Sequence, residues 1–307
     1  MKNQKQNHMV IVLTTVIIMF MITVMPIFHS LIYAASVPKL DEIRVALYID
    51  VRGTVPTVTL SSVNPLSIGI REGDGTSPWF EAPANEPTSF SMNNYMLKVL
   101  NTSDYSAAVS SYSKIASLGN PYVFKSSSNG KPIYQVRLGG FRTADEALAA
   151  RQKIPVDATL DRNKLEAAGP IYTSIGTYDS EAVATNHQKA MAQNGIITYV
   201  SIHANNTGNI VYSVWLGESI SEQQLENEKA AAVKAVPGLI FEPVDPTLPF
   251  LLKRHTVSIQ SASEPAITHY QFNGQNQKVW VHTGEAAIKV HERFGRSYRG
   301  SMEVTSY

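Results

Sequence analysis

Four polar or aromatic side chains stand at alternate positions of two strand-like segments. Residues 134–138 read Tyr-Gln-Val-Arg-Leu, and residues 212–216 read Tyr-Ser-Val-Trp-Leu. Successive side chains of a strand point to opposite faces, so Gln135 and Arg137 lie opposite the apolar set of the first strand. Ser213 and Trp215 lie opposite the apolar set of the second. Arg, Gln and Ser donate hydrogen bonds and an indole stacks on flat apolar faces, which together predict saccharide binding.

Trp215 allows a second interpretation. An outward Trp on an exposed sheet is typical of ligand-stacking surfaces, yet the ring can also tuck beneath a neighbouring loop or the other repeat. The saccharide hypothesis requires Arg137 and Trp215 to be exposed. Arg137 and Trp215 pointing into the hydrophobic interior, or helices covering that face, would refute it.

Catalytic and metal-binding patterns are missing from the sequence. There are no cysteines, which excludes disulfides, a thiol nucleophile and thiolate metal ligands. His282, His291 and Glu292 are close in sequence but do not have the spacing of a zinc motif. There is no Gly-x-Ser-x-Gly nucleophile motif. We therefore predict no catalytic residue, no metal site and no cofactor.

The two strand-like segments belong to an internal repeat. Residues 131–139 are echoed by residues 208–217, roughly 77 positions later, and a second matched pair of strands precedes them. Capping boxes that start at Thr143 and Ser221 mark equivalent helix starts. Each copy therefore predicts the order strand, helix, strand, strand, helix, strand.

Residues 93–161 and residues 169–243 are the predicted limits of the two copies. A βαββαβ chain of this length folds most simply as a ferredoxin-like sandwich, with both helices on one face of an antiparallel sheet. We expect the closing strands at residues 156–160 and 239–241. The other sheet face would then be open to solvent and would carry the predicted site.

The repeats are flanked by strand-rich segments. Residues 36–75 and 247–307 contain alternating apolar patterns, and residues 76–92 are rich in Pro, Ser and Glu, which indicates a linker. The predicted fold class is therefore α+β, with two ferredoxin-like units inserted into a β-rich flanking region.

Residues 1–35 read as a signal peptide or a membrane anchor. Lys2 and Lys5 precede a long apolar run, and small residues follow it. This order is typical of a signal peptide, and the run is also long enough to cross a membrane. In both cases we expect export to the cell envelope, with membrane contact at the N-terminus if the segment is retained. The net charge of +1 argues against nucleic acid as a partner.

Residues 134–141, Tyr-Gln-Val-Arg-Leu-Gly-Gly-Phe, followed by a capped alanine-containing helix, resemble the third strand of the SPOR domain family. The second copy is similar but has Trp215 where the family usually has Arg or Gln. The resemblance implies a ferredoxin-like fold that binds cell-wall glycan strands stripped of stem peptides, through the open sheet face. Ser174 and Lys98 stand where the family's first strand usually has Gln. The predicted glycan-binding residues are therefore Gln135, Arg137, Ser174, Ser213, Trp215 and Lys98.

The flanks resemble the stage II sporulation protein D / amidase-enhancer family. The most specific part is Tyr-Arg-Gly-Ser-Met-Glu-Val at residues 298–304. In that family the residues linked to glycan cleavage and amidase stimulation follow this motif and include a Glu-Met-Pro signature. The given sequence ends at Tyr307 and contains no Glu-Met-Pro, so no catalytic residue is carried over.

Three hypotheses follow. The first is a non-catalytic peptidoglycan-binding envelope protein linked to sporulation or cell division, with glycan strands and a cell-wall amidase as candidate partners. The alternative is the front part of a sporulation protein D-like lytic transglycosylase or amidase activator. The third is a protein-interaction or RNA-recognition module, and the export leader and near-neutral charge argue against RNA.

Overall fold

The computed structural model describes part of the chain, all of it within a unit that begins at Asp50. The predicted leader, residues 1–35, and the early part of the N-terminal flank lie outside the described residues. No helix in the described part is long and apolar enough to cross a membrane. The described residues are 57–72, 75–155, 160–257, 259, 266–273, 277–293 and 295–305.

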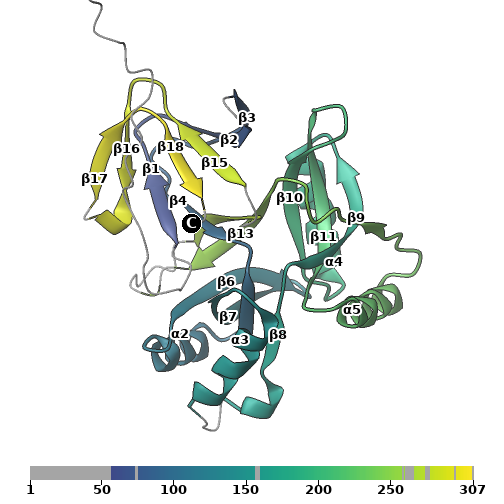
Figure 1. Cartoon of the computed structure of the whole chain (residues 1–307). Helices are drawn as coiled ribbons and strands as arrows, with labels where there is room; N and C mark the ends of the chain where they lie inside the picture. Colours follow the sequence, from purple (N-terminus) through teal and green to yellow (C-terminus); the bar gives the residue numbers. More distant parts are fainter. Residues whose placement is uncertain are drawn as a thin grey trace, which may run out of the picture. The chain divides into compact units, whose positions relative to one another are not determined.

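The first repeat folds as a ferredoxin-like unit (Figure 1). Its four strands are antiparallel neighbours in the order β8-β5-β7-β6. Its elements are β5 (Tyr95–Thr102), α2 (Tyr105–Ile115), β6 (Asn120–Ser128), β7 (Lys131–Phe141), α3 (Ala144–Ala150) and β8 (Glu166–Ala168).

The start of α3 and the inward-facing side chains of β7 are where the sequence predicts them. The backbone N–H of Glu146 donates to Thr143 Oγ1 at 3.2 Å, so the predicted capping residue starts α3. Tyr134, Val136 and Leu138 are buried in one core cluster with residues of α2, which confirms that the apolar set of β7 faces the helices.

Residues 171–243 repeat the same order of elements. Their strands are ordered β12-β9-β11-β10, again antiparallel. Val214 and Leu216 pack in a cluster with Ala184 and Met191 of the first helix, which confirms the predicted inward set. The elements are β9 (Ile171–Tyr178), α4 (Glu181–Gln193), β10 (Thr198–Ala204), β11 (Ile210–Ser219), α5 (Glu222–Ala235) and β12 (Glu242–Pro243).

Both closing strands differ from the prediction. The strand beside β5 is β8, at residues 166–168, and not residues 156–160. Leu160 is buried in the helix-side core without belonging to a strand, and residues 156–159 lie outside the described residues. In the second segment β12 follows the predicted residues 239–241 instead of coinciding with them. These strands have three and two residues, too few for an alternating pattern to locate them.

The flanking strands pair with one another across the inserted units. From β10 the main sheet continues through β13, β14, β4, β1, β16 and β17, and a second sheet has the order β18-β15-β2-β3. The strands are β1 (Val58–Ser61), β2 (Leu66–Glu72), β3 (Gly75–Ala82), β4 (Thr88–Met92), β13 (Phe250–Val257), β14 (Ala266–Phe272), β15 (Lys278–His282), β16 (Ala287–Val290), β17 (Arg296–Arg299) and β18 (Met302–Thr305).

The predicted linker at residues 76–92 is wrong, because it contains β3 and β4. Pro78 lies in β3, which is an edge strand of the second sheet, and an edge tolerates a residue without a backbone N–H. The ring of Phe80 lies 4.9 Å from that of Tyr270, and Phe90 is fully buried. Of the prolines in this segment Pro78 lies in the edge strand, and Pro83 and Pro87 lie between β3 and β4.

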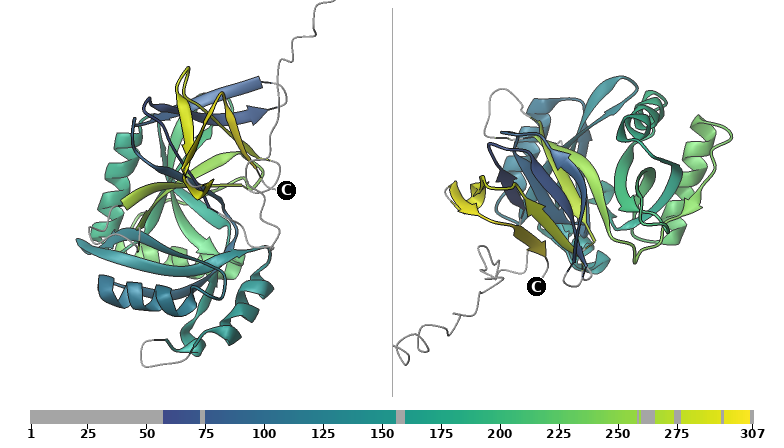
Figure 2. Two further views of the ribbon diagram at one scale, coloured as in Figure 1. Left: turned by 90° about the vertical axis from the view of Figure 1, so that its left-hand side faces the viewer. Right: turned by 90° about the horizontal axis from the view of Figure 1, so that it is seen from above.

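Strand β13 connects the first ferredoxin-like unit with the segment of residues 171–243. Its first half pairs with β10, from Phe250 to Lys253, and Thr256 pairs with Phe124 of β6. Figure 2 shows the arrangement from two further directions, with α2 and α5 on the outer sides of their strands. Strand β13 is therefore a common neighbour of both segments, next to the sheet faces that are turned away from the helices.

Candidate functional site

Five of the six predicted site residues are buried. Gln135, Arg137, Ser174, Ser213 and Trp215 are between 1% and 5% exposed. Their strands do present them opposite the helix-facing residues, since the helix-side clusters hold the alternate positions. The predicted open face, however, is covered, and the predicted exposure of these five side chains is wrong.

On the first unit, the cover comes from β13 and β11. Arg137 Nη1 donates to Asn101 Oδ1 at 2.8 Å, and Arg137 Nη2 lies 3.6 Å from Glu218 Oε2. Arg254 of β13 donates through Nη2 to Gln135 Oε1 at 3.1 Å and forms an ion pair with Glu218. The side chains chosen for sugar binding are therefore paired within the protein.

Aromatic rings enclose the same charges. The guanidinium carbon of Arg254 lies 3.7 Å from the ring centroid of Phe124 and 4.6 Å from that of Tyr199. The Tyr199 hydroxyl donates to Glu218 Oε2 at 2.8 Å. Arginine over an aromatic face is favourable when the pair is removed from water, so the rings help to hold Arg254 in place.

The carboxylate of Glu218 stays ionised in this setting. Burial raises its pKa, but Arg254 and Arg137 overcome that effect and lower the pKa to about 2. Burial lowers the pKa of Arg137, and Glu218 opposes this. Glu218 also has a positive φ of 133°, a conformation that costs energy for a residue with a side chain. We name the buried set Arg137, Glu218 and Arg254 the ion cluster.

Trp215 is covered by its own segment and by β13. Its ring lies 4.9 Å from that of Phe250, 5.5 Å from that of Tyr172 and 6.2 Å from that of His203. Ser213 Oγ lies within 2.8 Å of His203 Nε2. Trp215 is therefore covered, but by β13 and its own segment instead of the loop or the other repeat that the second interpretation named.

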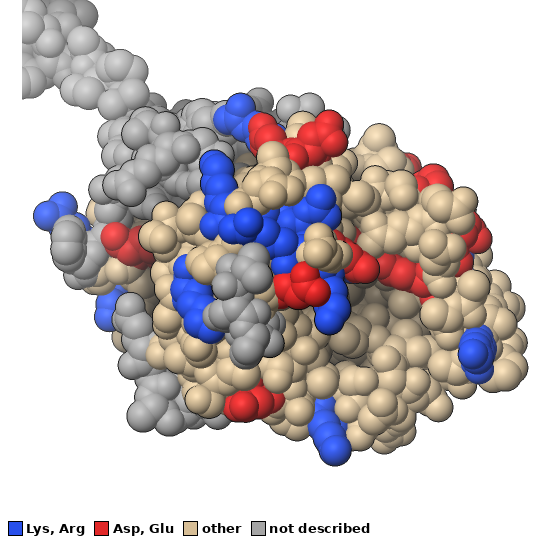
Figure 3. Space-filling view, turned by 90° about the horizontal axis from the view of Figure 1, so that it is seen from below, with Lys and Arg blue, Asp and Glu red and all other residues tan. Residues whose placement is uncertain are grey.

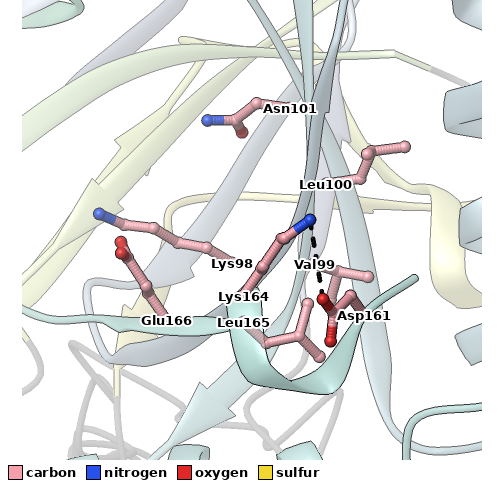
Figure 4. Close-up of a pocket in the computed structure, with 8 residues that line it drawn as sticks. All are labelled: Lys98, Val99, Leu100, Asn101, Asp161, Lys164, Leu165 and Glu166. Atoms are coloured by element: carbon pink, nitrogen blue, oxygen red, sulfur yellow. Dashed lines mark ion pairs between the residues drawn. The ribbon is translucent and has the colours of Figure 1, made fainter. Parts of the chain in front are cut away.

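Among the described residues, Lys98 is the one predicted site residue whose side chain remains partly accessible. Its side chain is 20% exposed, and its Nζ lies 3.9 Å from Glu228 Oε1. Strand β8 pairs with β5 along Met96, Leu97 and Lys98, and no strand of the described residues pairs with the rest of β5 on that side. A hollow of about 370 Å³ lies there (Figure 4).

We call this hollow the β5 groove. Figure 4 shows Lys98 and Glu166 extending from neighbouring strands, while Lys164 pairs with Asp161 at 3.7 Å. Asn101 faces the same space and also accepts the hydrogen bond of Arg137, which links the groove to the ion cluster. The groove is lined by Lys98, Val99, Leu100, Asn101, Asp161, Lys164, Leu165 and Glu166.

Charges of both signs mix on the surface seen from below. Figure 3 shows Lys and Arg gathered near its middle with Asp and Glu beside them. The β5 groove itself contributes two lysines and two carboxylates. Such a surface offers donors and acceptors to a polar neutral ligand without attracting one sign of charge. Among the described residues, no group of three His, Cys, Asp or Glu side chains could hold a metal ion.

Sequence reasoning missed the residues that make the cover. Glu218 and Arg254 were not among the candidates, although both carry charge inside strands. Phe250, Leu251 and Leu252 form a short apolar run of the kind that buried strands have. That run was a signal for β13, which begins at Phe250.

Comparison with known proteins identifies one domain. Residues 91–161 match the family model of the SPOR domain, which confirms the resemblance seen at residues 134–141. No curated protein matches the chain, and no solved structure matches it. The SPOR domain has a ferredoxin-like fold and is a peptidoglycan-binding module linked to cell division, and proteins that contain it are associated with the cell envelope.

Proposed function

We propose that this protein binds the glycan strands of peptidoglycan in the cell envelope through its SPOR domain. The observation that carries the proposal is the match of residues 91–161, which contain β5, β6 and β7. Strand β8 follows the matched residues and completes the sheet in the order β8-β5-β7-β6. Envelope association agrees with the export leader expected at residues 1–35. The link to sporulation and the likeness of the flanks to the stage II sporulation protein D family stay predictions.

The second segment, residues 171–243, is proposed as a second ferredoxin-like SPOR unit. The support is its identical order of elements and strands. Two linked sites on one polymer raise avidity by about 10²–10⁴ when both engage together. We call the arrangement seen in the structure, with Trp215 and Ser213 buried, the closed form. In the closed form any glycan contact by this unit uses other side chains.

The β5 groove is the proposed point of contact in the closed form. Lys98 and Lys164 donate hydrogen bonds, and Asp161 and Glu166 accept them, which suits the hydroxyl and amide groups of an amino sugar. Val99 and Leu165 also line the groove but are buried in the core of the unit, so the proposed contacts are polar. We propose strands without stem peptides as the ligand, which is what the family resemblance implies.

The covered face of β7 is proposed as a second glycan surface in an opened form. Arg137 Nε and Gln271 Nε2 are buried without a hydrogen-bond partner, although permanent cores seldom leave such donors unpaired. Movement of β13 away from β7 would free Gln135, and separation of Glu218 of β11 from β7 would free Arg137. Hydrogen exchange tests this: glycan should speed exchange of β13 amides, and unchanged exchange would limit binding to the groove.

Retention on purified cell walls tests the proposed function. We expect more protein on walls whose stem peptides an amidase has removed than on untreated walls. The Lys98→Ala/Lys164→Ala double variant should lose several-fold in retention, whereas Lys234→Ala, an exposed lysine on α5, should not. Equal retention on both walls, or an unaffected double variant, would contradict the proposal.

A further inference from the structure

The second sheet, β18-β15-β2-β3, has one buried face and one accessible face. Its buried face is built from apolar side chains that are at most 2% exposed: Leu66, Ile68, Ile70, Val279 and Val281. Alternation places Trp280 and His282 of β15 on the other face, and both are partly exposed. The other two tryptophans, Trp79 and Trp215, are buried. This sheet therefore has the outward indole that the sequence led us to expect at Trp215.

Trp280 and His282 form a stacked pair. Their ring centroids are 5.3 Å apart and their planes differ by 17°. The register partner of Trp280 on β2 is Gly69, which has no side chain to cover the indole. Glycine is required there, because a Cβ at Gly69 would lie 1.9 Å from the carbonyl oxygen of Ser77. The backbone of β3 at Ser77 therefore occupies the place that a side chain at residue 69 would take beside the register partner of Trp280.

Equal numbers of positively and negatively charged side chains lie around the aromatic pair. Glu303, the register partner of Trp280 on β18, lies 3.7 Å from Arg71 and 3.6 Å from Lys278. Glu81 of β3 lies on the same face, opposite Ser67. These two cations and two carboxylates sum to zero, so the face attracts neither polyanions nor polycations. It offers donors and acceptors around a flat aromatic surface.

We propose that Trp280 and His282 form a saccharide-binding platform that stacks a neutral pyranose ring. Charge balance favours an uncharged, hydroxyl-rich occupant over nucleic acid or an anionic lipid surface, and Arg71, Lys278 and Glu303 bond to its hydroxyls. The choice of a cell-wall glycan as the natural source rests on the proposed function. The site itself lies on a different sheet from the β5 groove and shares none of its residues.

Iodide quenching of tryptophan fluorescence tests the platform on the full chain. The probe ligand is a β-1,4-linked N-acetylglucosamine hexamer. Since Trp280 is the accessible tryptophan, we expect iodide to quench it and the hexamer to protect it. Trp280→Ala should weaken hexamer binding, measured by calorimetry, about three- to tenfold. Trp280→Phe should recover part of that loss, and Ile240→Ala, at a 76% exposed position on another segment, should cause none.

Two results would overturn the platform: no protection of the wild-type protein by the hexamer, or equal hexamer affinity in Trp280→Ala. The Lys98→Ala/Lys164→Ala variant separates this proposal from the proposed function. Hexamer protection should persist in that variant while its retention on trimmed walls falls. If the wild-type protein is retained on walls without stem peptides but the hexamer does not protect Trp280 from iodide, the platform alone is contradicted. If the hexamer protects Trp280 but the protein does not prefer walls without stem peptides, the SPOR proposal alone is contradicted.

Discussion

Replacing Glu218 by Gln removes a carboxylate that lies between two buried guanidinium groups. The side chains of Arg137 and Arg254 are 1% and 2% exposed, so water cannot compensate for the lost charge. Removing one partner of a buried ion pair costs about 3–5 kcal/mol. The pKa of Glu218 lies at about 2 in place of the ordinary 4.5, which corresponds to about 3 kcal/mol in the free energy of unfolding at neutral pH.

Urea unfolding of the purified protein at pH 7 measures this loss. The matched control is Glu226→Gln on α5, where the side chain is 60% exposed and pairs with Lys229 at 2.8 Å. An exposed pair of this kind contributes at most about 0.5 kcal/mol. A loss below about 1 kcal/mol in Glu218→Gln, or a loss equal to that of the control, would refute the reasoning.

The pH dependence gives a second, independent readout of the same group. Because the folded pKa of Glu218 is lowered, its contribution is fully present above about pH 4.5 and is lost as the pH falls toward 2. Glu218→Gln should lack this part of the acid dependence. A variant that loses stability between pH 4.5 and 2 as steeply as the wild type would show that the carboxylate is not responsible.

Three further outcomes follow from the described contacts. Trp215→Ala removes a ring packed against Phe250 and should cost about 3–5 kcal/mol in thermal unfolding, whereas a surface role would cost far less. Burial, and after it Arg254, lowers the pKa of His269 to about 3, so the fold favours the neutral imidazole. The free energy of unfolding should therefore be highest above about pH 6.5 and should fall by about 2 kcal/mol by pH 5. A urea midpoint that stays constant over this pH range would contradict the prediction. Ser221→Ala removes the acceptor of the Gln224 N–H and should cost about 1 kcal/mol by circular dichroism melting, while Ser221→Asp should restore it.

Local chemistry made much of the fold predictable. The capping residues Thr143 and Ser221 both accept a backbone N–H at a helix start, as their spacing indicated. Alternation assigned Val136 and Val214 correctly to the helix-facing sides. These features depend on residues within a few positions of one another, so a single sequence displays them. The match of residues 91–161 confirms the family resemblance that rested on the same strand.

The exposure of the site was not predictable in the same way. Alternation states which side of β7 carries Arg137, but not which distant segment lies against it. The cover comes from Arg254, which lies more than a hundred positions later in the chain, and from Glu218 of the second segment. Neither partner has a local pattern that names its target. A polar strand face is therefore compatible with an open surface and with a polar interface.

The ion cluster gives a reason for such an interface to be polar. Apolar side chains of similar volume often stabilise a fold as well as a buried ion pair does, so the cluster is not explained by stability alone. Its geometry is specific: Glu218 of β11 meets Arg137 of β7 and Arg254 of β13, and a displacement of any one strand leaves a buried charge unpaired. We infer that the cluster fixes the register between the two repeats and β13. On that reasoning Glu218→Gln should speed amide exchange along β13 as well as lower stability, whereas a purely energetic role would lower stability with the exchange pattern along β13 unchanged.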